Sequence, residues 1–246
     1  RQADVPLVGN LACTFDMLLD EMKHQGAQLD WSSWRDQLRE IEDAAEAKVQ
    51  ANLSSDEVPI DPQRMCREVR DWLNTQDQPI VIGDGGDIVA TAAKILPVRG
   101  EGAWMDPGPL GTVGVGMPFA IAAKLAHPDR PVVIMYGDCS FGFNGMEYDT
   151  AVRFGLPIIG IVGNDGAWGQ MMRPQLGIYG ADRLAAVLLN RTRYDKVVEA
   201  LGGYGEHVTE PDQLRPALER AAESGLPALI NVDIRQDRDY KGGIYV

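Results

Sequence analysis

Pro131-Val-Val-Ile-Met-Tyr-Gly-Asp-Cys-Ser140 is the most informative stretch of this chain. Its apolar run predicts a buried strand that ends at Gly137-Asp138-Cys139-Ser140. A second apolar run, residues 157–162, leads in the same way into Asn164-Asp165-Gly166-Ala167. Open α/β sheets bind their ligands at the carboxyl ends of the strands. Two oxygen-rich loops at neighbouring strand ends can hold one hard divalent cation, which usually serves an anionic phosphate group.

Outward from these two strands, helical and strand patterns alternate along the chain. The alternation predicts an α/β fold, a doubly wound parallel sheet with helices on both faces. Further strands are expected at residues 79–82 and 228–234. The expected helices are residues 61–73, 88–96, 112–127, 146–154, 194–201 and 212–223.

The N-terminal part has a different character. Residues 5–8 read as a short strand, so the chain begins as if in the middle of a domain, and residues 14–23 read as an amphipathic helix. Residues 31–58 are polar apart from one apolar stripe and predict a helical linker. The polar tail, residues 236–246, is expected to be mobile unless something docks on it.

Composition limits the class of protein. The 246 residues suffice for one large or two small domains, and the formal net charge of −13 argues against nucleic acid as a partner. Three widely spaced cysteines (Cys13, Cys66 and Cys139) fit a reducing cytoplasm and do not fit a disulfide framework. No apolar run approaches the roughly 18 residues of a membrane span, and no signal peptide opens the chain. We therefore expect a cytoplasmic protein without a membrane or nucleic-acid partner.

Two glycine-rich segments are candidate ligand loops. Gly83-Asp-Gly-Gly-Asp87 lies between a strand and a helix, where backbone can approach a phosphate and the helix N-terminus favours negative charge. A simple turn explains the segment equally well. The dinucleotide pattern Gly-x-Gly-x-x-Gly fails at its third glycine, at Ile88 here and at Phe119 in the second segment, and no Gly-Lys-Ser/Thr of a P-loop occurs.

The second segment, Pro109-Leu-Gly-Thr-Val-Gly-Val-Gly-Met-Pro118, precedes an apolar helix. Its glycines and prolines suggest backbone shaped around a flat ligand, with Val113 as a packing wedge. Close packing of a helix on the sheet through small residues is the alternative.

The acidic loops are expected to hold a metal ion. Asp138 and Asp165 each offer a carboxylate oxygen, and the carbonyl of Ala167 can add a third ligand to a near-octahedral Mg²⁺. Cys139 has no histidine nearby in the sequence and is not expected to be a nucleophile. The three histidines are expected to be isolated on the surface, without a role as general base; they are His24, His127 and His207.

Together these motifs resemble those of thiamine diphosphate-dependent enzymes. The Gly137–Ser140 and Asn164–Asp165 clusters are similar to the family's Gly-Asp-Gly…Asn-Asn signature, with Cys139 in place of the second glycine and Asp165 in place of an asparagine. Residues 110–118 are similar to the segment that grips the aminopyrimidine in the acetolactate synthase and oxalyl-CoA decarboxylase branch. The sequence of residues 141–149 is most similar to that of 2-hydroxyacyl-CoA lyases and their benzaldehyde lyase-like relatives.

The resemblance implies a site. Asp138, Asp165 and the Ala167 carbonyl would bind Mg²⁺, with Asn164 as the reserve ligand. The Gly111 carbonyl would accept from the cofactor's 4′-amino group. The residues implied to contact thiamine diphosphate are Gly85, Gly86, Asp87, Gly111, Val113, Gly137, Asp138, Cys139, Ser140, Asp165, Ala167, Trp168 and Gly169.

The resemblance also implies a domain plan and a function. Residues 1–30 would end a central domain, 31–58 form the linker, and 59–235 form the pyrophosphate-binding domain. The implied activity is that of a carbon–carbon lyase or ligase, foremost a 2-hydroxyacyl-CoA lyase producing formyl-CoA plus an aldehyde or ketone. An acetolactate synthase-like or benzaldehyde lyase-like enzyme is the alternative within the family. A non-catalytic cofactor-binding or regulatory subunit and a Mg²⁺-dependent nucleotide-binding protein are alternatives of other classes.

The resemblance implies an active site that needs one group from outside these residues. The family's activating glutamate lies in a pyrimidine-binding domain, and Glu147 is not assigned to its role. We therefore expect a companion polypeptide or domain and a homo- or hetero-oligomer. The expected substrate is a small molecule, an acyl-CoA, with an acyl pocket walled by Trp168, Met171, Met172 and Tyr179 and with CoA phosphates near Arg235, Arg238 and Lys241. Packing of a mobile loop and a solvated tail are the plainer explanations of those two groups.

Overall fold

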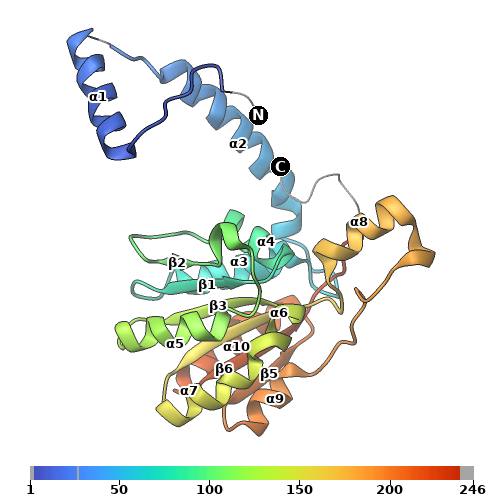
Figure 1. Cartoon of the computed structure of the whole chain (residues 1–246). Helices are drawn as coiled ribbons and strands as arrows, with labels where there is room; N and C mark the ends of the chain where they lie inside the picture. The colour runs from blue at the N-terminus through green and yellow to red at the C-terminus, as the bar shows by residue number, and fades with distance from the viewer. Residues whose placement is uncertain (1–2, 27, 239–246) are drawn as a thin grey trace. The chain divides into compact units, whose positions relative to one another are not determined.

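Six parallel strands form one sheet in the computed structural model, which describes residues 3–26 and 28–238 (Figure 1). The strand order β2-β1-β3-β4-β6-β5 puts the two strands of the opening motif side by side at the centre. The predicted α/β class and parallel sheet are confirmed. The strands are β1 (Ile80–Asp84), β2 (Trp104–Met105), β3 (Val132–Gly137), β4 (Ile158–Asn164), β5 (Tyr204–Val208) and β6 (Ala228–Asp233).

Helices cover both faces of the sheet, as a doubly wound fold requires. Successive strand residues point to opposite faces, so Val81 joins one core cluster while Ile80 and Ile82 join the other. The first cluster packs under α3 (Pro62–Leu73), α4 (Asp87–Ile95) and α10 (Pro211–Glu223); the second packs under α5 (Gly116–Ala126), α6 (Asp138–Asn144), α7 (Tyr148–Phe154) and α9 (Tyr194–Ala200).

The helices depart from the sequence prediction in two ways. The helix expected from residue 112 begins only at Gly116, because Gly111 and Gly114 have positive φ angles of 63° and 86° that an α-helix does not accommodate. Two further helices were not predicted: α6 (Asp138–Asn144) begins at the first acidic loop, and α8 (Gly169–Tyr179) follows the second. Both differences shape the backbone beside the carboxyl ends of the strands.

The chain divides into two compact units, Arg1–Lys48 and Val49–Val246. The first contains α1 (Leu11–His24) and most of α2 (Ser32–Leu53), and neither helix has a buried residue. The strand predicted at residues 5–8 is wrong: this segment is irregular and exposed, since no neighbouring strand offers it hydrogen bonds. The domain limits expected at residues 30 and 58 stay predictions.

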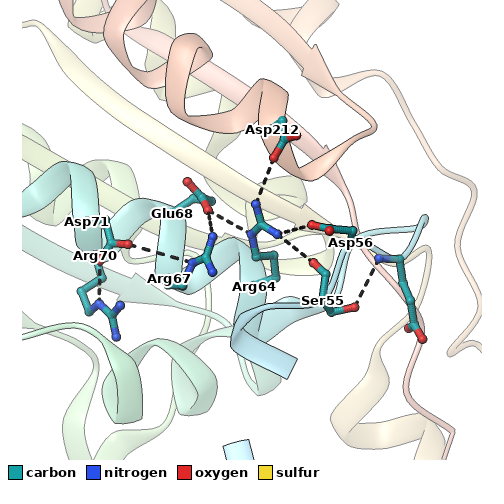
Figure 2. A network of polar contacts seen from close by, with 9 residues as sticks. Ser55, Asp56, Arg64, Arg67, Glu68, Arg70, Asp71 and Asp212 are labelled. Carbon is teal, nitrogen blue, oxygen red and sulfur yellow. Dashed lines mark hydrogen bonds and ion pairs between the residues drawn. The ribbon is translucent and has the colours of Figure 1, made fainter. Parts of the chain in front are cut away.

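Within the second unit, a buried arginine fastens the segment before α3 (Figure 2). The Arg64 side chain donates to Glu68 at 2.9 Å, to Asp56 at 2.6 Å and to Asp212 at 3.1 Å. It also donates to the carbonyl of Ser55 at 3.0 Å. One side chain therefore ties the 55–56 segment and the first turn of α10 to α3.

The first residues after β6 are hydrogen-bonded to the rest of the second unit. Arg235 donates its backbone N–H to the Ile60 carbonyl at 2.8 Å and its guanidinium to Asp61 at 2.6 Å. Gln236 donates to the Asp165 carbonyl at 3.2 Å. Among the described residues, no helix combines the length and apolar character needed to cross a membrane.

Candidate functional site

The two acidic loops meet at one edge of the sheet. In the parallel register of β3 and β4, Gly137 pairs with Gly163, so Asp138 and Asp165 follow immediately at neighbouring strand ends. Asp138 is the first residue of α6, and Asp165 lies in the turn between β4 and α8. The expectation that the two loops are adjacent is confirmed.

Asp138 is buried and bonded on both carboxylate oxygens. Its Oδ1 accepts from the backbone N–H of Cys139 at 2.7 Å, and its Oδ2 accepts from that of Gly166 at 2.8 Å. Burial raises the pKa of Asp138 to about 6, although these donors lower it. The carboxylate of the first loop therefore fixes the backbone of the second.

Asp165 is nearly as enclosed. Its Oδ1 accepts from the backbone N–H of Ala167 at 3.1 Å. Burial, and then the neighbouring charge of Asp138, raise the pKa of Asp165 to about 7. A carboxylate whose proton affinity is raised by a neighbouring carboxylate belongs to a site that a divalent cation would stabilise.

Asn164, the reserve metal ligand, has other partners. Its Nδ2 donates to the Thr192 carbonyl at 3.0 Å and to Asn231 Oδ1 at 3.1 Å. Within the described ranges, no three His, Cys, Asp or Glu side chains gather around one point. The Asn164 bonds use only the amide nitrogen; Asn164 Oδ1, the atom that could bind a metal, is buried and has no hydrogen-bond partner among the described residues, so Asn164 stays the reserve beside Asp138, Asp165 and the Ala167 carbonyl.

The first glycine-rich segment forms the turn from β1 to α4. Gly85 has a φ of +142°, and a Cβ there would lie 3.0 Å from the backbone nitrogen of Gly137. Gly86 caps α4, whose first residue is Asp87. Gly86 and Asp87 at this helix start line the same cavity as Asp138 and Asp165, and the N-terminus of a helix favours an anion.

Asp84 holds the second glycine-rich segment, a role that the sequence reading missed. Its buried carboxylate accepts from the backbone N–H of Gly114 at 2.9 Å and of Gly116 at 2.7 Å. Burial raises the pKa of Asp84, and these donors lower it. Asn144 adds a bond from its Nδ2 to the Gly114 carbonyl. A buried carboxylate at the end of a strand was the available signal.

A cavity of about 320 Å³ lies between these loops. Every residue implied to contact the cofactor lies in its lining except Gly85 and Ser140. The lining consists of Gly86, Asp87, Ile88, Gly111, Val113, Gly137, Asp138, Cys139, Gly163, Asp165, Ala167, Trp168, Gly169, Gln170, Met171 and Ile234.

The two residues after Asp138 differ in role. The Ser140 hydroxyl donates to the carbonyls of Asp84 and Gly137, so it joins the ends of β1 and β3 and does not line the cavity. Cys139 lines the cavity. Burial, followed by the charges of Asp138 and Asp165, raises the pKa of its thiol to about 12, which keeps it a poor nucleophile.

Helix α8 divides the residues proposed for an acyl pocket. Trp168 and Met171 line the cavity. Met172 is buried in a small cluster with Ala167 and Val187, and Tyr179 is 61% exposed outside the lining. The first pair is thus brought to the cavity and the second pair is not.

Two polar pairs involve residues considered in the sequence analysis. Asp87, expected to help hold a diphosphate, forms a two-bond ion pair with Arg173 of α8. His207 was expected to be isolated on the surface, which is wrong: its Nε2 lies 3.1 Å from Asp233 Oδ1. His207 is absent from the cavity lining, so no role as a general base follows.

Comparison with known protein families shows to which family the chain belongs. A family model described as "Thiamine pyrophosphate enzyme, C-terminal TPP binding domain" matches residues 84–232. The chain belongs to this family. As a thiamine pyrophosphate enzyme domain, it carries within the matched range the acidic pair, both glycine-rich segments except Gly83, and the cavity lining except Ile234.

Curated relatives of this thiamine pyrophosphate enzyme domain include proteins named for two different activities. The acetolactate synthase large subunit of Mycobacterium tuberculosis is 41% identical over 94% of this chain and 41% of its own length. The 2-hydroxyacyl-CoA lyase 2 of Caenorhabditis elegans is 41% identical over 87% of this chain and 34% of its own length. The chain thus spans about two-fifths or less of these relatives.

A solved structure supports the fold. The thiamine diphosphate-dependent 4-hydroxybenzoylformate decarboxylase of Rhodococcus jostii matches 73% of this chain and 33% of its own, with a TM-score of 0.66 and 23% identity.

Proposed function

We propose that this thiamine pyrophosphate enzyme domain binds thiamine diphosphate and Mg²⁺ for the making or breaking of a carbon–carbon bond. One observation carries the proposal: the acidic pair and the Gly111–Val113 segment line the same cavity. A metal–diphosphate seat alone would suit many nucleotide-binding proteins. A seat joined to a loop for a flat ring suits this cofactor.

The roles of the chain's residues follow from their positions. Asp138, Asp165 and the Ala167 carbonyl would hold Mg²⁺, and backbone at Gly86 would donate to the diphosphate; Cys139, whose N–H is taken by Asp138, would line the same seat. Val113, half-buried in the lining, would support the ring system, with the Gly111 carbonyl as an acceptor.

Bound thiamine diphosphate supplies a carbon nucleophile and a store for the electrons of the broken bond. The chain's own residues position the cofactor and exclude water. Glu147 contacts Thr150 at 2.7 Å and lies outside the lining, so it is not proposed as the activating group. That group is expected on a pyrimidine-binding domain, within a homo- or hetero-oligomer in the cytoplasm.

For substrate class, we propose a 2-hydroxyacyl-CoA, cleaved reversibly to formyl-CoA and an aldehyde or ketone. Trp168 and Met171 supply an apolar wall beside the acidic pair. An acetolactate synthase-like reaction is the second candidate, favoured by the longer match of this chain to that relative.

The end of the chain enters the proposal as a support for CoA. The Arg235 side chain donates to Asp61, while that of Arg238 donates to Gln236. Lys241 lies outside the described residues. Removal of residues 236–246 is expected to weaken turnover of CoA thioesters much more than cofactor binding. Equal losses in both would contradict this part of the proposal.

Ligand binding tests the cofactor assignment. Thiamine diphosphate with Mg²⁺ should raise the Tm of the chain, while ATP or NAD with Mg²⁺ should leave it unchanged. Asp165→Ala should abolish the rise. Stabilisation by ATP with Mg²⁺ would instead favour a nucleotide-binding protein.

An activity assay tests the reaction. The chain, combined with its pyrimidine-binding partner, is expected to join formyl-CoA to aldehydes or ketones faster than it converts pyruvate or benzoin. Preference for pyruvate would favour the acetolactate synthase-like reaction. Cofactor binding without any carbon–carbon chemistry would favour a non-catalytic subunit.

A further inference from the structure

A segment remote in sequence is bonded along the proposed metal loop. Trp168 donates its backbone N–H to the Val187 carbonyl at 2.8 Å, and Leu189 donates to the Gly166 carbonyl at 2.8 Å. Between these bonds, Ala167 and Leu188 form an antiparallel bridge. The loop that follows Asp165 is therefore held from one side by residues 187–189.

Arg191, two residues further on, holds the start of the same loop. Its guanidinium donates through Nη1 to the Asn164 carbonyl at 2.7 Å and through Nη2 to the Ile234 carbonyl at 2.8 Å. These carbonyls lie at the carboxyl ends of β4 and β6. The planar fork of an arginine suits two acceptors fixed at such a spacing.

The stem of Arg191 also packs against the loop. A Cβ at Gly166 would lie 3.5 Å from Arg191 Cγ. The positive charge lies near both acidic residues, so it partly offsets the rise in the pKa of Asp138 and of Asp165 that burial causes. Its other charged neighbour is Asp233, 3.8 Å from Nη1.

We propose that Arg191 is a positioning residue for the metal loop. By holding the Asn164 carbonyl against the end of β6, it sets the direction in which the next residue, Asp165, presents its carboxylate to Mg²⁺. The inference rests on the proposed function, because it concerns the affinity of the same metal site. Groups that orient a metal ligand typically change metal affinity about 10- to 100-fold when removed.

The chain contains a matched control. Arg193 is also an arginine of this segment, and it binds the buried Asp195 through two bonds of 2.8 and 2.6 Å. Among the described residues, its side chain forms no hydrogen bond to β4, β6 or the metal loop. Arg193→Met therefore removes a structural ion pair from the same segment without freeing Asn164.

The experiment measures how the binding of thiamine diphosphate depends on Mg²⁺ concentration, and how Mn²⁺ binds by electron paramagnetic resonance. Arg191→Met is expected to raise the Mg²⁺ concentration at half-saturation about 10-fold or more. Arg191→Lys, which can keep one of the two bonds, is expected to be intermediate. Arg193→Met should lower the Tm with an unchanged Mg²⁺ dependence.

Two outcomes would overturn the inference: a wild-type Mg²⁺ dependence in Arg191→Met, or an equal shift in Arg193→Met. If Arg191→Met does not fold, Arg191→Lys decides, and a wild-type metal dependence there would count against the positioning role. Failure of the wild-type chain to bind thiamine diphosphate with Mg²⁺ would instead overturn the proposed function itself.

Discussion

Asp138 Oδ2 accepts the backbone N–H of Gly166 at 2.8 Å, so the carboxylate at the end of one strand holds the turn that follows its neighbour. The other oxygen accepts from Cys139. An asparagine at this position keeps the size of the side chain but can accept only through its single oxygen.

Asp138→Asn is therefore expected to weaken Mg²⁺ affinity at least about 100-fold, because it removes a charged ligand and also one bond to the Gly166 turn. Calorimetric titration with Mg²⁺ and thiamine diphosphate measures this. Asp149→Asn, at an exposed carboxylate of α7 paired with Arg153, is the control and should bind as the wild type does. Comparable losses in both variants would contradict the role of Asp138.

Acidity of the carboxylate pair predicts how metal affinity varies with pH. In the metal-free chain, Asp138 has a pKa of about 6 and Asp165 one of about 7, so below these values Mg²⁺ must displace protons. Affinity for Mg²⁺ should rise from about pH 5 to about pH 8 and then level off, with protons released on binding. A constant affinity across this range would disagree with the raised pKa values.

The same shifts predict the stability of the metal-free chain. The folded-state pKa values lie above the ordinary aspartate value near 4, so between about pH 4 and pH 7 the folded chain binds more protons than the unfolded chain. The contribution of this pair to the free energy of unfolding should therefore fall as the pH rises through that window. Urea unfolding of the wild type and Asp165→Asn measures it, and the variant should lose less stability over the range.

Asp84 predicts a link between the ring-binding loop and the sheet. Asp84→Asn can satisfy only one of the N–H groups of Gly114 and Gly116, so the free energy of unfolding should fall by about 1–3 kcal/mol. Affinity for thiamine diphosphate should fall with it. Asp106 is the control, since its exposed carboxylate accepts from Gly108 in the same loop region, and Asp106→Asn should cost less than about 1 kcal/mol. Equal effects would remove the special role of Asp84.

The Arg64 network should matter for stability and leave ligand binding unchanged (Figure 2). Arg64→Ala removes the buried guanidinium that bonds Glu68, Asp56 and Asp212, leaves Glu68 with Arg67 alone, and is expected to cost about 2–3 kcal/mol in urea unfolding. Arg70→Ala, which loses an ion pair with the adjacent Asp71, should cost less than about 1 kcal/mol. A changed affinity for thiamine diphosphate in Arg64→Ala would be unexpected, since Arg64 lies outside the cavity lining.

The central strands were predictable because strands buried on both faces read as continuous apolar runs, as residues 131–136 and 157–162 do. The sequence reading missed β5, Tyr204–Val208, which lies at the sheet edge and is only partly buried. Residues 5–8 carry a strand-like apolar pattern, yet a strand also needs a partner, which no local pattern reveals.

For the site, the family resemblance, which rests on the glycine and aspartate motifs, implied most of the residues that line the cavity. Asp84 and Arg191 were missed, since their importance lies in bonds to Gly116 and Ile234 that span 32 and 43 positions of the chain. Asn164 was expected only as the reserve ligand and stays so, since its amide nitrogen binds Asn231 in β6 while its oxygen has no partner among the described residues.

The Ser140 hydroxyl, which joins the carbonyls of Asp84 and Gly137, ties the ends of β1 and β3 together on the rim of the cavity. A rim bonded in this way has little backbone freedom left to lose when a ligand arrives, so most of the ordering entropy falls on the ligand. Rigidity also makes the rim selective. An anion that fits the gap between the two strand ends is therefore expected to be favoured over one that would require these ends to move.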